Sequence, residues 1–217
     1  MISTNSQDTQ QSGLHTGGLP TDLHSVGTVT SASSFKKMVT TERISKMMSS
    51  QDLSKGFEIL GRKFSPEEVV TLSIAAGMEK KASRPVALDL NRLGAFANYF
   101  AILSASNGRQ VCAVAEGIRL FIKQAFGISP IMVDGLESQQ WVFLDYGFLF
   151  VHVFQEATRE MYSLEQLWSK GQLIDFTEQS ASALLSEVKD LQAKVAEQRK
   201  ITLAEIEAKR LSELEEA

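Results

Sequence analysis

The chain has 217 residues, 43% of them hydrophobic, which is enough for one ordinary domain with extensions. Its net charge of −4 argues against non-specific adhesion to nucleic acid, because that requires lysines and arginines to neutralise phosphates. The single cysteine, Cys112, excludes an intramolecular disulfide framework and fits a reducing compartment. No apolar run reaches the roughly 18 residues of a membrane span, and residues 1–35 contain no Lys or Arg for a secretory signal. We therefore expect a cytoplasmic protein that does not engage a membrane.

The N-terminal part, residues 1–64, reads as an extension. Residues 1–34 are dominated by Ser, Thr, Gln and Gly, which predicts a disordered tail. Residues 35–64 mix lysines with methionines and other apolar residues. That mixture favours a partly ordered linker with a marginal helix over a basic patch for an acidic partner.

Two helices and three strands are predicted between residues 65 and 133. Ser65-Pro66-Glu67-Glu68 is a capping box with proline at the first helical position. Asn107 is a good N-cap for a second helix, which Gly127 and Pro130 end. Short apolar runs predict strands at 86–90, 99–103 and 131–133. The order strand–helix–strand from 99 to 133 implies a crossover helix on one face of a sheet.

A β-hairpin is predicted from Trp141–Asp145 and Phe148–Phe154, with Asp145-Tyr146-Gly147 as the turn. The second strand is apolar on both sides, so it should be covered on both faces. In the first strand, one side carries Trp141, Phe143 and Asp145 and the other carries Val142, Leu144 and Tyr146. One set should be core; the other is either packed too or forms an aromatic surface patch with an acid at its margin. Residues 159–168 then fold back as helical turns.

These elements predict an α/β (α+β) domain over residues 65–170, with a mixed, mostly five-stranded sheet and flanking helices. Residues 171–217 form a C-terminal extension, since 180–216 contain no proline or glycine and are rich in Ala, Leu, Glu and Lys. A long amphipathic helix is expected there. Docking on the domain, self-association as a homodimer and a free solvated arm remain equal alternatives for it.

Catalytic chemistry finds little support in the residues. Of the three histidines, His152 is the one within the predicted domain, and the pattern favours a packed, hydrogen-bonded histidine over a metal ligand. Cys112 has no neighbouring cation to activate its thiol. Glycine-rich phosphate loops are absent, and neither Asp89 nor Asp145 has a second acid two residues away. We therefore expect no enzyme, no catalytic residue, no bound metal and no cofactor.

Several blocks in order resemble the ribosomal silencing factor family, also called Iojap. The blocks are Leu88-Asp89-Leu90, Tyr99-Phe100, Arg109-Gln110-Val111, Val133-Asp134-Gly135, Trp141–Gly147, Val151–Phe154 and Arg159–Trp168. The resemblance implies a nucleotidyltransferase-like α/β domain that is not a catalyst. It also implies binding to large-subunit ribosomal protein fourteen on the large ribosomal subunit, which blocks joining of the small subunit and represses translation, without sequence-specific nucleic-acid recognition. The partner-binding residues that it carries over are Trp141, Asp145 and Tyr146.

Two other functions remain as alternatives. One is a nucleotidyltransferase-like, metal-dependent enzyme that uses Asp89 with another acid. The other is an adaptor that acts through the C-terminal helix, with the globular domain as its anchor.

Overall fold

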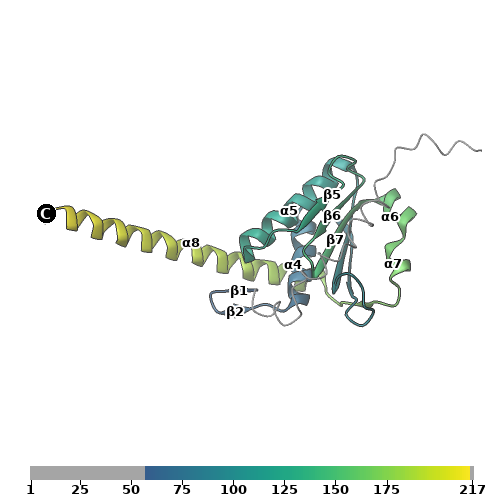
Figure 1. Cartoon of the computed structure of the whole chain (residues 1–217), viewed down its shortest axis with the longest axis horizontal. Helices are drawn as coiled ribbons and strands as arrows, with labels where there is room; N and C mark the ends of the chain where they lie inside the picture. Colours follow the sequence, from purple (N-terminus) through teal and green to yellow (C-terminus); the bar gives the residue numbers. More distant parts are fainter. Residues whose placement is uncertain (1–56, 216–217) are drawn as a thin grey trace, which may run out of the picture.

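A six-stranded mixed sheet forms the centre of the fold (Figure 1) in the computed structural model, which describes residues 57–215. Its strand order is β5-β6-β7-β4-β3-β8. The β4–β7 pair is parallel and the other neighbours are antiparallel. The strands are β3 (Ser83–Asp89), β4 (Tyr99–Ala105), β5 (Met132–Asp134), β6 (Trp141–Asp145), β7 (Leu149–Gln155) and β8 (Gln172–Leu173).

The predicted α/β class and the hairpin are confirmed, but the prediction of five strands is wrong by one. The added strand, β8, is only two residues long and pairs with Leu88 and Asp89 at the end of β3. Such a short segment carries no periodicity of its own, so only the partner strand defines it.

Helices α4 (Pro66–Glu79) and α5 (Gly108–Phe126) cover one face of the sheet. Both start where the sequence predicts. The Ser65 hydroxyl accepts from the Glu68 amide while the Glu68 carboxylate accepts from the Ser65 amide, and the Asn107 side chain accepts from the Gln110 amide. The α5 helix ends at Gly127, whose φ of 71° is a left-handed cap that glycine adopts without strain.

The crossover helix α5 links two strands that are not neighbours. The chain leaves β4, passes along α5 and enters β5 at the edge of the sheet, and β6 and β7 then fill the space between them. Strand β7 is consequently central and buried on both faces, as its doubly apolar sequence predicts.

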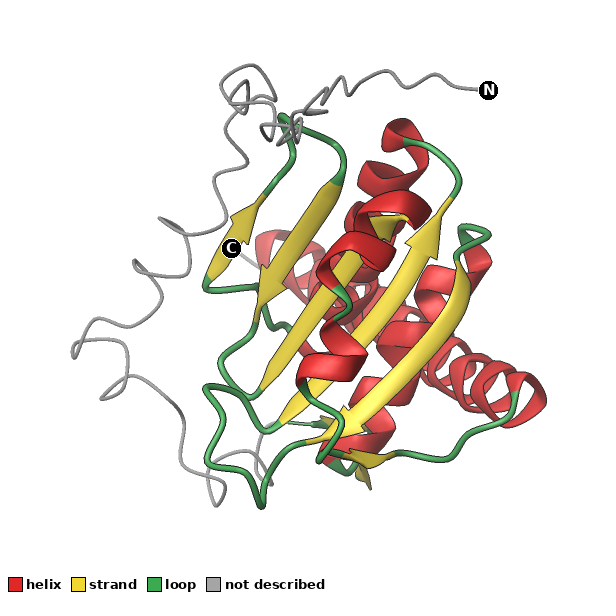
Figure 2. Cartoon of the chain, turned by 90° about the vertical axis from the view of Figure 1, so that its right-hand side faces the viewer, coloured by secondary structure: helices red, strands yellow, loops and turns green. Residues whose placement is uncertain are grey.

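Helices α6 (Glu156–Tyr162) and α7 (Leu164–Leu167) lie on the opposite face (Figure 2), in front of the sheet in this view, with the larger helices behind it. They form the predicted helical turns after the hairpin. The buried Arg159 fastens them to the sheet: its guanidinium donates to the Arg84 carbonyl at 2.7 Å, to the Ser104 hydroxyl at 2.8 Å and to Glu165.

Residues 57–64 form a small hairpin of β1 (Glu58–Ile59) and β2 (Arg62–Lys63), not the predicted linker or helix. Phe57, Ile59 and Phe64 are buried in the core against α5 and the rest of the main cluster. Packing therefore begins before Ser65, because three large apolar side chains gain more from burial than from solvation. The predictions for residues 1–56 lie outside the described residues.

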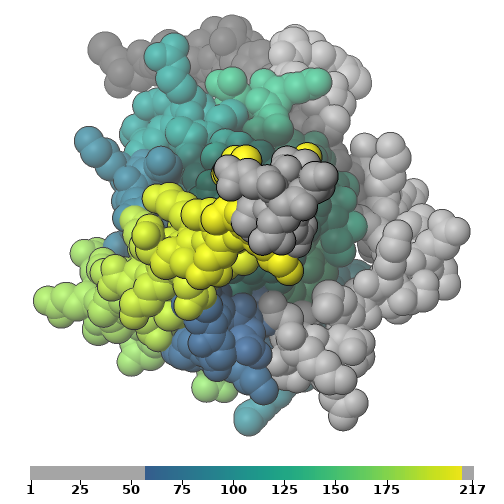
Figure 3. All heavy atoms as spheres, turned by 90° about the vertical axis from the view of Figure 1, so that its left-hand side faces the viewer, coloured from purple at the N-terminus to yellow at the C-terminus, as the bar shows by residue number. Residues whose placement is uncertain are grey.

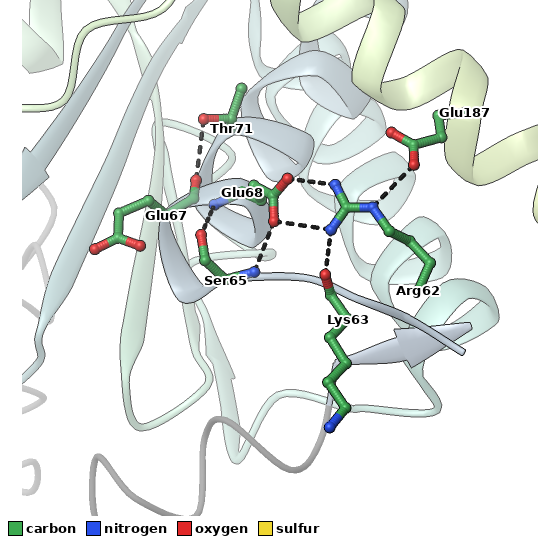
Figure 4. Close-up of polar contacts among 7 residues, drawn as sticks. All are labelled: Arg62, Lys63, Ser65, Glu67, Glu68, Thr71 and Glu187. Atoms are coloured by element: carbon green, nitrogen blue, oxygen red, sulfur yellow. Dashed lines mark hydrogen bonds and ion pairs between the residues drawn. The ribbon is translucent and has the colours of Figure 1, made fainter. Parts of the chain in front are cut away.

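The predicted C-terminal helix is α8 (Glu178–Glu215), 38 residues long. Its first turns dock on α4, where Ala181, Leu185 and Val188 are buried. Arg62 links the two helices (Figure 4), since it donates to Glu187 of α8 at 3.0 Å and to Glu68 of α4 at 2.5 Å.

The rest of α8 leaves the domain. Residues 196–211 are exposed, and the helix projects away from the sheet in Figure 1 and toward the viewer in Figure 3. Of the three alternatives for this helix, docking on the domain is confirmed for its first turns, and exposure to solvent is confirmed for residues 196–211. Self-association stays a prediction. Among the described residues, no helix is long and apolar enough to cross a membrane.

Candidate partner-binding face

A layer of aromatic rings lies between the sheet and helices α6 and α7. Strand alternation places one set of side chains from β4, β6 and β7 on this side. Tyr162 at the end of α6 and Trp168 directly after α7 add a ring each. The members of this aromatic layer are Phe100, Trp141, Phe143, Phe150, His152, Phe154, Tyr162 and Trp168. The other set, with Val142, Leu144 and Tyr146, belongs to the core under α4 and α5.

Trp141 is the half-buried ring of this layer on β6. Its indole stacks on Phe154, with ring centroids 4.7 Å apart and an interplanar angle of 27°, and leans on Tyr162 at 5.0 Å. The indole Nε1–H donates to Nδ1 of His152 at 3.3 Å. An aromatic side chain that is packed on one side and exposed to solvent on the other is typical of hot spots in protein–protein interfaces.

His152 is buried in the middle of the aromatic layer. Burial lowers its pKa to about 3, so the imidazole is neutral at physiological pH. This confirms the prediction of a packed, hydrogen-bonded histidine. Its Nε2 has no hydrogen-bond partner in the described part of the chain.

The structure does not bring Trp141, Asp145 and Tyr146 together on one surface. Asp145 is 5% exposed and lies at the far end of β6 from Trp141. Its carboxylate accepts from the Gly147 amide at 2.7 Å and so stabilises the turn. Tyr146 is also 5% exposed, points into the core on the other face, and has its pKa raised by burial. The expectation that Asp145 is the acid at the margin of an open patch is therefore wrong; the part of these residues in partner binding stays a prediction.

Sequence reasoning missed the acid that does lie beside Trp141. The antiparallel register pairs Met132 with Asp145 and Asp134 with Phe143, which places Met132 and Asp134 on the same side of the sheet as Trp141. Helix α6 packs mainly on β7 and β4, so Met132, Asp134 and Trp141 at the β5–β6 edge are only half-buried. The alternation of side chains in residues 131–134 puts Met132 and Asp134 on one side of the strand. Only the pairing of β5 with β6 shows that this is the side of Trp141.

We call Met132, Asp134, Trp141, Phe143 and Tyr162 the hairpin face. Two acids lie at this face, the half-buried Asp134 on β5 and the exposed Glu137 in the loop after it. The glutamates of α6 and α7 are ion-paired elsewhere: Glu156 and Glu160 with Arg84 of β3, which β4 and β7 separate from β6, and Glu165 with the buried Arg159. The hydrogen bond from Arg84 lowers the pKa of Glu156. Met161, 78% exposed, adds apolar area next to Tyr162. The face suits a basic partner with apolar contacts at its centre.

The remaining candidates for chemistry have structural roles. Asp89 accepts from the backbone and side-chain amides of Asn91 and so holds the loop after β3. Cys112 is half-buried, with its thiol 3.8 Å from the Leu136 carbonyl. No group of three potential metal-ligating side chains occurs within residues 57–215. Two cavities of about 380 Å³ each lie on the other side of the sheet, one between α4 and α8 and one between α5 and β5–β6.

The fold and this face define a mixed α/β domain with an aromatic surface at one sheet edge that also carries Asp134 and Glu137. Residues 63–209 match the family model described as "Ribosomal silencing factor during starvation", and the chain belongs to this family. The resemblance in the sequence motifs is thereby confirmed.

Three relatives illustrate the family. The ribosomal silencing factor RsfS of Halalkalibacterium halodurans is 32% identical over 111 residues, which cover 51% of this chain and 94% of the relative. The chloroplastic protein Iojap of Zea mays is 27% identical over 114 residues, 50% of this chain and 49% of the relative. The mouse protein named "Mitochondrial assembly of ribosomal large subunit protein 1" is 28% identical over 94 residues, 42% of this chain and 41% of the relative.

Proposed function

We propose that this protein binds the large ribosomal subunit through large-subunit ribosomal protein fourteen and represses translation by blocking association with the small subunit. Membership of the silencing factor family supports the repressing role. The name of the mouse relative, which refers to the large ribosomal subunit, supports the choice of subunit.

The half-buried Trp141, with the half-buried Asp134 on the same side of the sheet and the exposed Glu137 in the loop after β5, is the observation that carries the proposed contact. Ribosomal proteins are basic because they neutralise ribosomal RNA, so the two acids at the hairpin face favour one of them over the phosphate backbone. In this proposal Trp141 contacts the partner directly. Asp145 and Tyr146 contribute from inside, because they hold the turn that follows β6.

Obstruction requires bulk as well as affinity. The domain docks by its hairpin face while α8 extends the occupied volume, since a helix of 38 residues is about 57 Å long at about 1.5 Å per residue.

Co-sedimentation with isolated large subunits tests the contact. Trp141→Ala should weaken binding by about 2 kcal/mol or more, as truncation of a central aromatic anchor does. Asp134→Lys should also weaken binding, and by more at low salt than at high salt, because it reverses a charge on the hairpin face. The matched control is Phe96→Ala, which removes an exposed aromatic from the loop before β4, at the opposite end of the sheet from Trp141. Wild-type binding by folded Trp141→Ala would contradict the proposed face.

A second candidate, an adaptor acting through α8, is favoured by one observation. The solvated part of this helix carries large apolar side chains that are more than half exposed, namely Ile201, Leu203, Ile206 and Leu211. Removing residues 196–217 keeps the docked turns of α8 and so preserves the domain. If subunit joining is blocked equally well without them, the hairpin face suffices; if blocking is lost while large-subunit binding remains, α8 is the active part. The sedimentation of full-length and truncated protein also shows whether this segment makes a homodimer.

A further inference from the structure

The hydrogen bond between Trp141 and His152 joins the open edge of the aromatic layer to its buried centre. Trp141 is on β6 and His152 on β7, where the register pairs His152 with Phe143, two residues along from Trp141. The donor is the indole Nε1–H and the acceptor is Nδ1 of the imidazole, 3.3 Å away. Within the described residues, this bond ties a buried polar group to the one tryptophan of the hairpin face.

This hydrogen bond determines which nitrogen of the neutral His152 imidazole carries the proton. Because Nδ1 accepts, the neutral ring carries its proton on Nε2, and this Nε2 has no partner in the described part of the chain. The surrounding groups are rings without charge: Phe100 at 5.0 Å, Phe143 at 5.2 Å, Phe154 at 6.1 Å and Trp141 at 5.7 Å. The lowered pKa of His152 keeps Nδ1 available as an acceptor at physiological pH.

A phenylalanine would fill the same space without a half-satisfied polar group. Burying a polar ring with one unpartnered nitrogen is unfavourable, whereas the neighbouring positions Phe143, Phe150 and Phe154 show that the layer accepts phenylalanine. The polar ring has one hydrogen-bonded partner, and that partner is the indole on the surface.

We infer that His152 is a positioning residue, whose Nδ1 holds the indole of Trp141 in one orientation on the hairpin face so that the partner meets a preorganised aromatic surface. This inference rests on the proposed function. Stacking on Phe154 fixes the tilt of the indole, and the hydrogen bond fixes which way its Nε1–H edge is turned. Ordering a side chain before binding removes an entropic cost of association, worth roughly two- to tenfold in affinity.

His152→Phe is the direct test, because it keeps the ring and removes the acceptor. Large-subunit binding should weaken roughly fivefold. His152→Asn carries an amide oxygen near the position of Nδ1 and should restore part of the loss. Trp141→Phe removes the donor instead, and on that background His152→Phe should have no further effect, since both changes break one bond.

A spectroscopic arm separates orientation from stability. In full-length protein labelled with ¹⁵N, the Trp141 indole N–H signal, assigned with Trp168→Phe, should show slow exchange with solvent in wild type and fast exchange in His152→Phe. Melting curves of each variant confirm that it is folded.

The outcomes distinguish a failure of the positioning role of His152 from a failure of the proposed function. If Trp141→Ala weakens binding but folded His152→Phe binds like wild type, the positioning role is overturned and the proposed function stands. If the two substitutions weaken binding additively on the Trp141→Phe background, His152 acts on the fold and the inference is again overturned. If Trp141→Ala binds like wild type, the proposed face fails, and the positioning role in binding fails with it.

Discussion

Acidification should destabilise this protein well before its carboxylates protonate, because of His152. Burial lowers the pKa of this imidazole to about 3 in the folded chain, against about 6.5 when unfolded. Between these values the unfolded state binds one more proton than the folded state. Stability is therefore complete above about pH 6.5 and falls as the pH drops toward 3.

The magnitude follows from the two pKa values. One proton of linkage removes on the order of 1 kcal/mol of unfolding free energy between about pH 7.5 and pH 5.5, and on the order of 3 kcal/mol by about pH 4.5. Three carboxylates have a lowered pKa in the folded chain, namely Glu68, Glu116 and Glu156. The stability that they contribute is lost only below about pH 4.5. For Glu68, burial raises the pKa, but the hydrogen bonds from Arg62 and the Ser65 amide outweigh it.

Urea unfolding followed by circular dichroism at about pH 7.5 and about pH 5.5 measures the effect. His152→Phe should lose most of the pH dependence that wild type shows in this window, while both proteins keep the same slope against urea. Parallel pH dependence in the two proteins would show that the imidazole is not buried and neutral, and the reasoning would fail.

Three further predictions concern stability. Arg159→Met should cost about 2–4 kcal/mol, because it leaves the Ser104 hydroxyl, the Arg84 carbonyl and Glu165 without their donor; Arg84→Met at the exposed Arg84–Glu156 pair is the control, with a loss below about 1 kcal/mol by thermal unfolding. Gly135→Ala should cost about 2 kcal/mol or more, since its φ is 84° and an added Cβ would lie 1.8 Å from the Trp141 carbonyl oxygen; Gly94→Ala has a similar φ with open space around it and should cost less in the same melts. Val188→Ala should cost about 1–2 kcal/mol and speed backbone hydrogen exchange in the first turns of α8, because Val188 is fully buried against α4; Val195→Ala, half-buried further along, should change exchange little.

Local signals made much of the fold predictable. The caps at Ser65 and Asn107 and the stop at Gly127 are each made by neighbouring residues, so the sequence carries them directly. The hairpin was readable for the same reason. By contrast, the β1–β2 hairpin turns through Leu60 and Gly61, both with positive φ. Leucine is not typical of a turn position with positive φ, so residues 57–64 were predicted as part of a linker.

The candidate site was only half predictable. The alternation of β6 assigned Trp141 and Tyr146 to opposite faces, and the structure agrees. Which side chains are exposed depends on where α6 packs on the sheet and on the pairing of β5 with β6. Both are contacts between residues far apart in the sequence, so no local pattern predicts them. Asp145 was considered as the acid of a surface patch because strand alternation puts it on the same side as Trp141, but its carboxylate is buried and accepts from the Gly147 amide.

The parallel pairing of β4 with β7 also dictates when the domain can be completed during synthesis. The two central strands are separated by α5, β5 and β6, so β4 emerges from the ribosome long before its partner exists. Until then β4, whose residues are all buried in the finished domain, has one edge without a hydrogen-bonded partner strand. The β6–β7 hairpin closes over few residues and we expect it to form first and then capture β4. A nascent chain stalled before Leu149 should therefore be open to proteolysis, and one that has released Gln155 should be protected.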